Sequence, residues 1–166
     1  SKAAASVSGA NIPQANIFVS DPIPIKVKSI ERIAKADLEF DGIDITGQSF
    51  VAHVFLNNKK ANQDTPRTSD NGYAGSFSVF AHGGRCYGGP GHCEPTPRTN
   101  IYDLRASHPL TPGYALLGIT EQIKKIAKEK KEITVTVVPV ATSYNMMADM
   151  KNLLKFKKLR LVIYDK

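Results

Sequence analysis

The residue types best suited to chemistry gather in one glycine-rich segment of this 166-residue sequence, residues 85–93. Cys86 and Cys93 lie in this segment with three glycines between them, and Pro90 stiffens its tip. Two cysteines in such a setting form a disulfide, bind a metal as a pair, or remain free thiols. The simplest interpretation is a disulfide-closed loop, which would stabilise the fold by about 2 kcal/mol because the loop is short.

A metal site is the second interpretation of the same segment. Thiolate and imidazole donors suit Cu(I) or zinc, and four such side chains are close in sequence: His82, Cys86, His92 and Cys93. The adjacency of His92 and Cys93 is awkward for one tetrahedral centre, and no second Cys-x-x-Cys pair is present. A thiol nucleophile paired with His92 would lack a third group to orient it.

The remaining histidines predict no catalytic pair. His53 lies within an apolar strand-like run, and His108 precedes a proline in a loop. None of the four histidines falls on the predicted helix, and none has helical spacing to another.

Lysines dominate the last third of the sequence. The formal net charge is +7, and ten lysines and one arginine lie between Lys124 and Lys166. The simplest interpretation of these lysines is a solvent-exposed face without a specific role. The alternative is a surface that docks an acidic partner. The residues of that candidate surface are Lys124, Lys125, Lys128, Lys155, Lys157 and Lys158. No aromatic stacking residues are interleaved, so no nucleic acid is expected, and no apolar run approaches the roughly 18 residues of a membrane span.

The elements that must position these residues are mostly strands. We expect a flexible tail over residues 1–15 and a single domain over residues 16–166. Alternating or β-branched runs predict strands near residues 17–19, 25–30, 36–40, 49–56, 75–82, 132–140 and 159–164. Both faces of the run at 49–56 are apolar, so it should be a central strand.

One helix is expected, at about residues 119–131, with Thr120 as its N-cap and Glu121 in its first turn. An Asp41-Gly42 turn and a long loop over residues 83–111 should separate the strands. The whole predicts a mainly β domain, an antiparallel β-sandwich or barrel-like fold with one short helix.

Several segments in series resemble the region that follows the copper domain in tyrosinase and polyphenol oxidase proteins. These segments are residues 36–44, 50–58 and 73–83. A strand that ends in two asparagines and is followed, after a loop, by an Ala-Gly-Ser-Phe strand is similar to the bacterial branch. Residues 117–120, the helix and the run to Pro139 are similar to the end of the plant polyphenol oxidase domain. The resemblance covers roughly residues 36–164.

This resemblance implies an accessory role without catalysis. Type-3 copper centres use six histidines, mostly from a helical bundle, and this chain has four. The chain alone is therefore expected to be no enzyme and to bind no cofactor, with copper in a partner domain of a monophenol or catechol oxidase. The family's C-terminal domain packs over the copper-domain entrance, shields it, and places one bulky side chain toward the substrate pocket. Tyr87 is the first candidate for that lid residue, and Tyr114 is the competitor.

Two other functions remain open from the sequence. One is a free-standing secreted binding module that uses the basic docking surface. The other is a small copper- or zinc-handling protein built on the Cys86–Cys93 loop. An extracytoplasmic location, periplasmic or secreted, is expected and would favour the disulfide.

Overall fold

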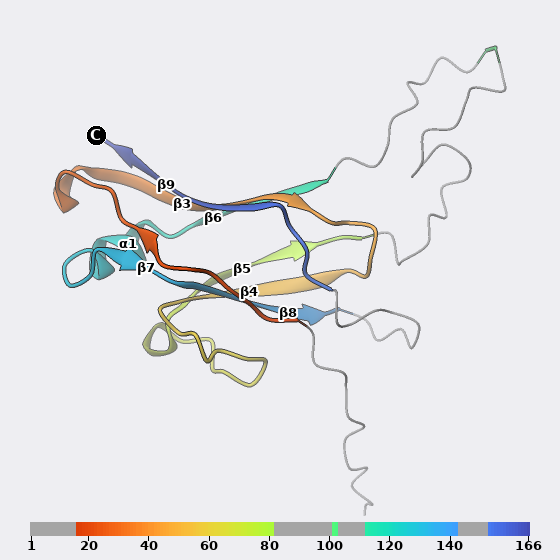
Figure 1. Ribbon diagram of the computed structural model, residues 1–166, viewed down its shortest axis with the longest axis horizontal. Coiled ribbons are helices and arrows are strands. Elements are labelled where there is room, and N and C mark those ends of the chain that lie inside the picture. Colours follow the sequence, from red (N-terminus) through yellow and green to blue (C-terminus); the bar gives the residue numbers. More distant parts are fainter. Residues whose placement is uncertain (1–15, 82–100, 103–111, 143–152) are drawn as a thin grey trace, which may run out of the picture.

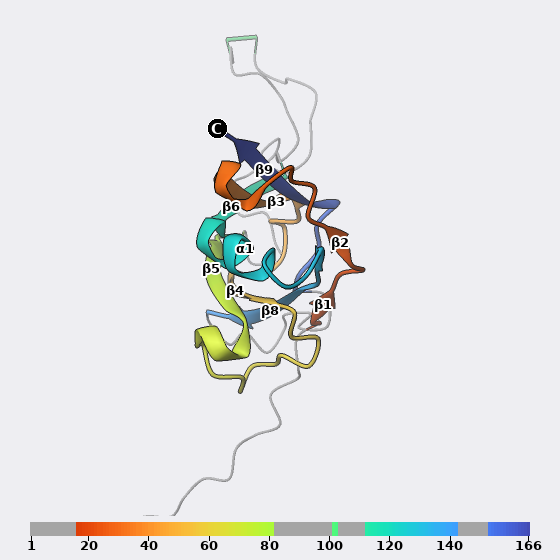
Figure 2. The same cartoon turned by 90° about the vertical axis from the view of Figure 1, so that its left-hand side faces the viewer.

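The computed structural model describes residues 16–81, 101–102, 112–142 and 153–166. These residues form two layers of antiparallel strands, with one short helix at one end (Figures 1 and 2). The predicted fold class, a mainly β antiparallel domain with one helix, is confirmed, and the described strands do not close into a barrel. Within the described residues, no helix has the length and apolar character that crossing a membrane requires.

The first layer is a four-stranded sheet in the order β1-β8-β4-β5. Its strands are β1 (Phe18–Val19), β8 (Val135–Ala141), β4 (Phe50–Leu56) and β5 (Tyr73–Val79). Strand β4 pairs on both sides, with β8 and with β5, so the prediction of a central strand at 49–56 is confirmed. Its two faces are both buried because the loop after β4 covers the face that points away from the other sheet.

The second layer is a three-stranded sheet in the order β6-β3-β9. Its strands are β6 (Gly113–Gly118), β3 (Ile33–Ile43) and β9 (Lys158–Asp165). Strand β3 lies in the middle, and its Ala36, Leu38 and Phe40 face the core. The predicted Asp41-Gly42 turn is wrong: Gly42, at φ 69°, forms a bulge that lets β3 continue to Ile43.

The core lies between the two layers. Phe40 of β3 contacts Phe77 of β5, with ring centroids 4.7 Å apart, and Phe156 at 5.5 Å. Phe156 in turn meets Phe18 of β1 at 4.8 Å. Aromatic rings from four segments therefore tie the layers together where the strands themselves do not pair.

Helix α1 (Thr120–Ile126) covers one end of this core (Figure 2). It begins one residue after the predicted start and ends well before residue 131, because residues 116–118 extend β6 and a turn follows Ile126. The predicted Thr120 cap is also wrong. The Thr120 hydroxyl instead accepts a hydrogen bond from the Ala36 N–H at 3.0 Å, and Ile119 precedes the helix without a side-chain cap. This bond joins the helix to β3.

The predicted strand at 25–30 is absent. Strand β2 (Ile23–Pro24), which pairs with β7 (Glu132–Ile133), comes directly before this segment. A 3₁₀ turn, η1 (Ile30–Arg32), begins at its last residue. Ile25, Val27 and Ile30 still pack on the core, half-buried. The alternation thus reports burial of every second side chain, which a single extended segment achieves without a pairing partner.

Candidate functional site

The six lysines of the predicted docking surface fall into two groups at opposite ends of the sandwich (Figure 1). Lys124 and Lys125 are on α1 and Lys128 follows it, near the end where Ile119 N–H donates to Ala36 O at 2.8 Å. Lys155, Lys157 and Lys158 are at the start of β9, where Asp44 N–H donates to Lys155 O at 2.9 Å. The eight residue steps from Ala36 to Asp44, nearly all of them in β3, separate these ends by about 26 Å. The six lysines do not form one patch.

The residues of the predicted cysteine-loop sites all lie outside the described residues. These are the disulfide pair Cys86 and Cys93, the lid candidate Tyr87, and the metal candidates His82 and His92. The same holds for His108. The disulfide, the metal site and the Tyr87 lid therefore stay predictions.

The competing lid candidate, Tyr114, lies on the outward face of the second sheet. The register places Tyr114 beside Asp41 and Leu116 beside Glu39, on the side away from the core. On β9, Tyr164 lies beside Lys35 on the same side. Three large apolar side chains thus share this outer sheet face, with Tyr114 53%, Leu116 45% and Tyr164 44% exposed. Sheet faces that point to solvent are normally polar, so this one is a candidate interface.

Charged pairs hold the two tyrosines of the outer sheet face in place. Glu39 forms an ion pair with Arg160 at 2.9 Å, and its carboxylate neighbours Tyr114. Desolvation and the neighbouring Glu39 carboxylate raise the pKa of Tyr114. The Arg160–Glu39 pair therefore adds no net charge beside the Tyr114 ring.

The second pair on the outer sheet face is Lys35 with Asp37. The Lys35 Nζ lies 2.7 Å from Asp37 Oδ2 and 5.6 Å from the centre of the Tyr164 ring. The Asp37 carboxylate raises the pKa of Lys35. Asp37 is fully buried, and its Oδ1 has no hydrogen-bond partner among the described residues. Lys35 therefore screens this carboxylate and keeps the Tyr164 ring beside it.

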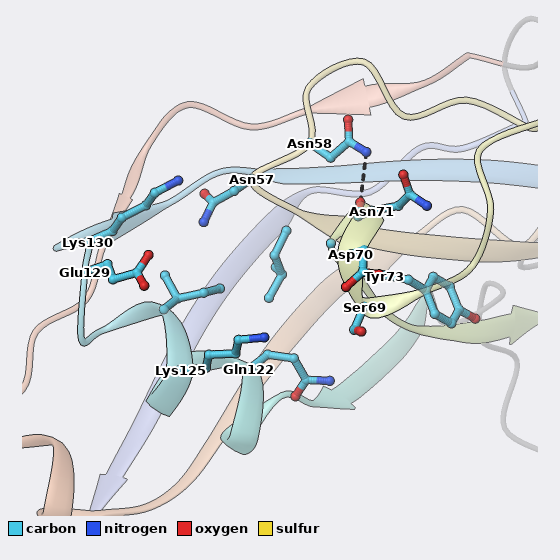
Figure 3. Close-up of a pocket in the computed structure, with 13 residues that line it drawn as sticks. Asn57, Asn58, Ser69, Asp70, Asn71, Tyr73, Gln122, Lys125, Glu129 and Lys130 are labelled. Carbon is cyan, nitrogen blue, oxygen red and sulfur yellow. Dashed lines mark hydrogen bonds between the residues drawn. The ribbon is translucent and has the colours of Figure 1, made fainter.

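A cleft of about 500 Å³ lies at the opposite side of the domain, between α1 and the 3₁₀ turn η2 (Ser69–Asn71) (Figure 3). We call it the α1–η2 cleft. It is lined by Leu56, Asn57, Asn58, Ser69, Asp70, Asn71, Gly72, Tyr73, Gln122, Lys125, Ile126, Glu129 and Lys130. The end of β4 contributes its floor, η2 one wall, and α1 with its following turn the other.

Backbone and amide hydrogen bonds fix the η2 wall against β4. Leu56 N–H donates to Gly72 O at 2.7 Å, and Asn58 Nδ2 donates to Asn71 O at 2.8 Å. Asn57 Oδ1 accepts from Thr134 N–H at 3.0 Å, which ties the floor to the residue between β7 and β8. The wall and floor are therefore built before any ligand arrives.

Polar groups without partners face into the α1–η2 cleft from both walls. Among the described residues, the carboxylate of Asp70, the amide of Gln122 and the ammonium of Lys125 form no hydrogen bond or ion pair. Figure 3 places Asp70 on the η2 side and Lys125 on the helix side, with both charged groups turned toward the space between. The cleft can thus offer donors and acceptors to one bound molecule.

Sequence reasoning missed this cleft. The loop after β4 was expected only as a connection, although its Asn57-Asn58 and Asp70-Asn71-Gly72 groups signal tight turns with side chains that hydrogen-bond. No local signal indicates that α1, some fifty residues later, packs across from this loop. Only the pairing of β6 with β3 brings the helix there.

His53 is the one histidine that the structure describes, and it is a buried residue of β4. It faces the covering loop, 6.1 Å from the ring of Tyr73, and its Nδ1 has no hydrogen-bond partner among the described residues. Among those residues no group of three His, Cys, Asp or Glu side chains could hold a metal ion. The described part of the chain therefore does not fit a copper site.

His53 should make the stability of the domain depend on pH. Burial, and then the positive charge of Arg67, lower the pKa of His53. In the unfolded chain His53 binds a proton near pH 6.5, whereas in the folded chain it binds one only at lower pH. The contribution of neutral His53 to the free energy of unfolding is therefore complete above pH 6.5 and is lost as the pH falls below that value. The melting temperature of the wild type should therefore fall more between pH 7.5 and 5 than that of His53→Gln. The other three histidines stay in both proteins, and equal pH slopes would contradict the prediction.

Comparisons with known proteins support a fold relationship. No protein-family model matches this sequence, and no curated protein matches it. A structure of latent aurone synthase (polyphenol oxidase) from a natural source matches with 16% identity and a TM-score of 0.50, over 95% of this chain and 26% of that chain. A recombinantly expressed latent aurone synthase (polyphenol oxidase) matches over the same shares, with 16% identity and a TM-score of 0.48.

The chain spans about a quarter of the length of the polyphenol oxidase structures that it matches. At this level of identity the likeness shows the fold alone: the described sandwich is related to a part of the polyphenol oxidase structure.

Proposed function

We propose that this chain is a non-catalytic accessory domain or subunit of a tyrosinase-like type-3 copper oxidase. It packs over the copper-binding domain and shields the copper site from substrate. The observation that supports this most is the match of almost the whole chain to a quarter of an oxidase described as latent. The proposal assigns this chain to the C-terminal region of such an oxidase and the copper to the remainder.

The donor residues of this chain support an accessory role. The sequence has four histidines, and the described one, His53, is a buried strand residue that belongs to no metal-binding group within the described part of the chain. Oxidation of phenols therefore belongs to the partner. The contribution of this chain is to cover an entrance and exclude substrate from it.

The outer sheet face is the contact surface in this proposal, and Tyr114 is its lid residue. Two ion pairs of that face, Lys35–Asp37 and Arg160–Glu39, already neutralise the charges beside its rings, which favours burial of those rings against an apolar rim. The Tyr114 side chain is itself a phenol, the group that the shielded site accepts. Tyr114 is already 53% exposed on this face, so its ring is available for contact.

Inhibition in trans tests this function. The copper-loaded catalytic domain encoded in the same reading frame, or in the neighbouring gene, is assayed with a catechol while the 166-residue chain is added. Saturable inhibition is expected, and the chain with Cu(II) alone should give no quinone above a copper-only blank. Absence of inhibition at a large excess of chain would refute the shielding role.

Two aromatic truncations then test the contact surface. Tyr114→Ala and Tyr164→Ala should each raise the inhibition constant by about tenfold or more, the scale of an interface aromatic. Phe80→Ala removes a more exposed ring, 84% accessible, after β5 in the other layer and should leave inhibition unchanged. Equal inhibition by all three variants would move the contact surface elsewhere while leaving the shielding role intact.

A further inference from the structure

We infer that the α1–η2 cleft binds a neutral saccharide. This inference goes beyond the shielding role and does not depend on it, because the cleft and the outer sheet face share no residue. The cleft volume of about 500 Å³ lies within the range of roughly 300–1,000 Å³ that ligand pockets occupy.

The charges of the cleft favour a neutral ligand. Four charged side chains line the cleft, and their charges sum to zero. They are Lys125, Lys130, Asp70 and Glu129. A strongly anionic ligand would meet the acids and a cationic one the lysines, so neither gains net attraction. The chain as a whole is basic, and this cleft is a place where that excess is cancelled.

The hydrogen-bonding groups of the cleft favour hydroxyls. Asp70 can only accept, Lys125 can only donate, and Gln122 does both, and none of them has a partner within the described part of the chain. A hydroxyl donates and accepts at once, so adjacent hydroxyls on one ring can satisfy an acid on one wall and an ammonium on the other. Figure 3 places these groups on facing walls.

The floor of the cleft suits the carbon face of a sugar ring. Leu56, nearly fully buried, and Ile126, half-buried, give this floor its apolar side chains. A pyranose has an apolar C–H face and a polar rim, which matches an apolar floor between polar walls. The hydrogen bonds that hold η2 to β4 mean that the site needs little ordering on binding.

NMR titration of the isotopically labelled 166-residue chain tests this inference. Cellobiose, N,N′-diacetylchitobiose and maltose serve as probes, with glutamate and inorganic phosphate as charged competitors for the same cleft. We expect at least one disaccharide to shift the backbone amides of residues 56–58, 69–73 and 122–130, with a Kd of about 1 mM or tighter. The charged probes should leave those amides unmoved.

Matched variants locate the binding. Asp70→Ala and Lys125→Ala should each weaken the disaccharide about tenfold, the effect of losing a hydrogen bond to a charged group. Asp64→Ala, in the same loop, and Lys124→Ala, on the same helix, alter side chains that do not line the cleft and should leave the affinity unchanged.

Three outcomes would overturn the inference. Amides of the cleft that move with glutamate or phosphate but with no disaccharide would mean that the ligand class is wrong. Amides that move with no probe would mean that the cleft is not a saccharide site. Unchanged affinity in Asp70→Ala and Lys125→Ala would place the binding elsewhere. All three outcomes are measured by NMR on the 166-residue chain alone. A failure of the chain to inhibit the oxidase would therefore leave the saccharide inference unaffected.

Discussion

Phe40→Ala is expected to lower the free energy of unfolding by about 3–5 kcal/mol. Phe40 is fully buried on the central strand of the second sheet, and its ring meets Phe77 and Phe156. Alanine leaves a cavity between the two layers that neither sheet can fill without bending β3. Against a total stability of about 5–15 kcal/mol, this is a large fraction of what keeps the domain folded.

Urea unfolding followed by circular dichroism measures this loss. Phe80→Ala is the control because it makes the same chemical change at a ring that is 84% exposed. The control should change stability by less than about 0.5 kcal/mol. Similar midpoints for the two variants would mean that the layers are not joined through Phe40.

Gly72→Ala is the second large effect we expect, a loss of more than about 2 kcal/mol, from left-handed strain plus a backbone clash. Gly72 has a φ of 78°, and an added Cβ would lie 2.2 Å from Leu56 O. That carbonyl belongs to β4 and cannot swing aside as a side chain does. The variant should also displace the η2 wall, because the Leu56 N–H bond to Gly72 O depends on the same approach.

Gly47→Ala is the matched control for Gly72→Ala. An added Cβ at Gly47 meets nothing within 4 Å, and its φ is not in the left-handed region. Alanine there should be neutral or stabilise the domain by up to about 1 kcal/mol, because it restricts the unfolded chain. Thermal melts of both variants test this difference, with a lower melting temperature expected for Gly72→Ala. Equal melting temperatures would contradict the left-handed backbone at Gly72.

Secondary structure was predicted correctly from the sequence where the local residue pattern and the tertiary packing favour the same conformation. The runs that became β4 and β8 are rich in β-branched and aromatic residues and are buried on both faces, so propensity and packing favour the same conformation. The fold class follows from several such runs with turn signals between them. Pro139 does not interrupt β8, where it pairs with Ala52 of β4.

Predictions failed where partners distant in sequence decide the local conformation. Leu116 and Leu117 lie just before the predicted helix, and leucine favours helices, yet their pairing with β3 makes them strand residues. Residues 25–30 show a clear strand period but lack a pairing neighbour. Thr120 is positioned to cap α1 but bonds to Ala36 of β3 instead. In each case a tertiary hydrogen bond, present or missing, overrode local preference.

The candidate sites show the same division. Tyr114 could be proposed from the sequence as an exposed aromatic, but its position on the outer sheet face depends on the β3–β6 register. The six lysines of the predicted docking surface are close in sequence, but the fold places them in two groups that lie about the length of β3 apart. The α1–η2 cleft combines two segments that no spacing rule connects.

The pairing of β3 with β9 also determines when this domain can fold during synthesis. Ile33 is paired with Asp165, and the side chain of Arg32 donates to Lys166 O, 134 positions along the chain. Until the ribosome has released β9, the middle strand of the second sheet has one open edge, and Phe156 is missing from the aromatic contacts that join the layers. Contacts this distant make for slow folding, typically milliseconds to seconds, and an unpaired edge can recruit other nascent chains. A chaperone that covers β3 during that interval would therefore raise the yield of folded domain without altering its final stability.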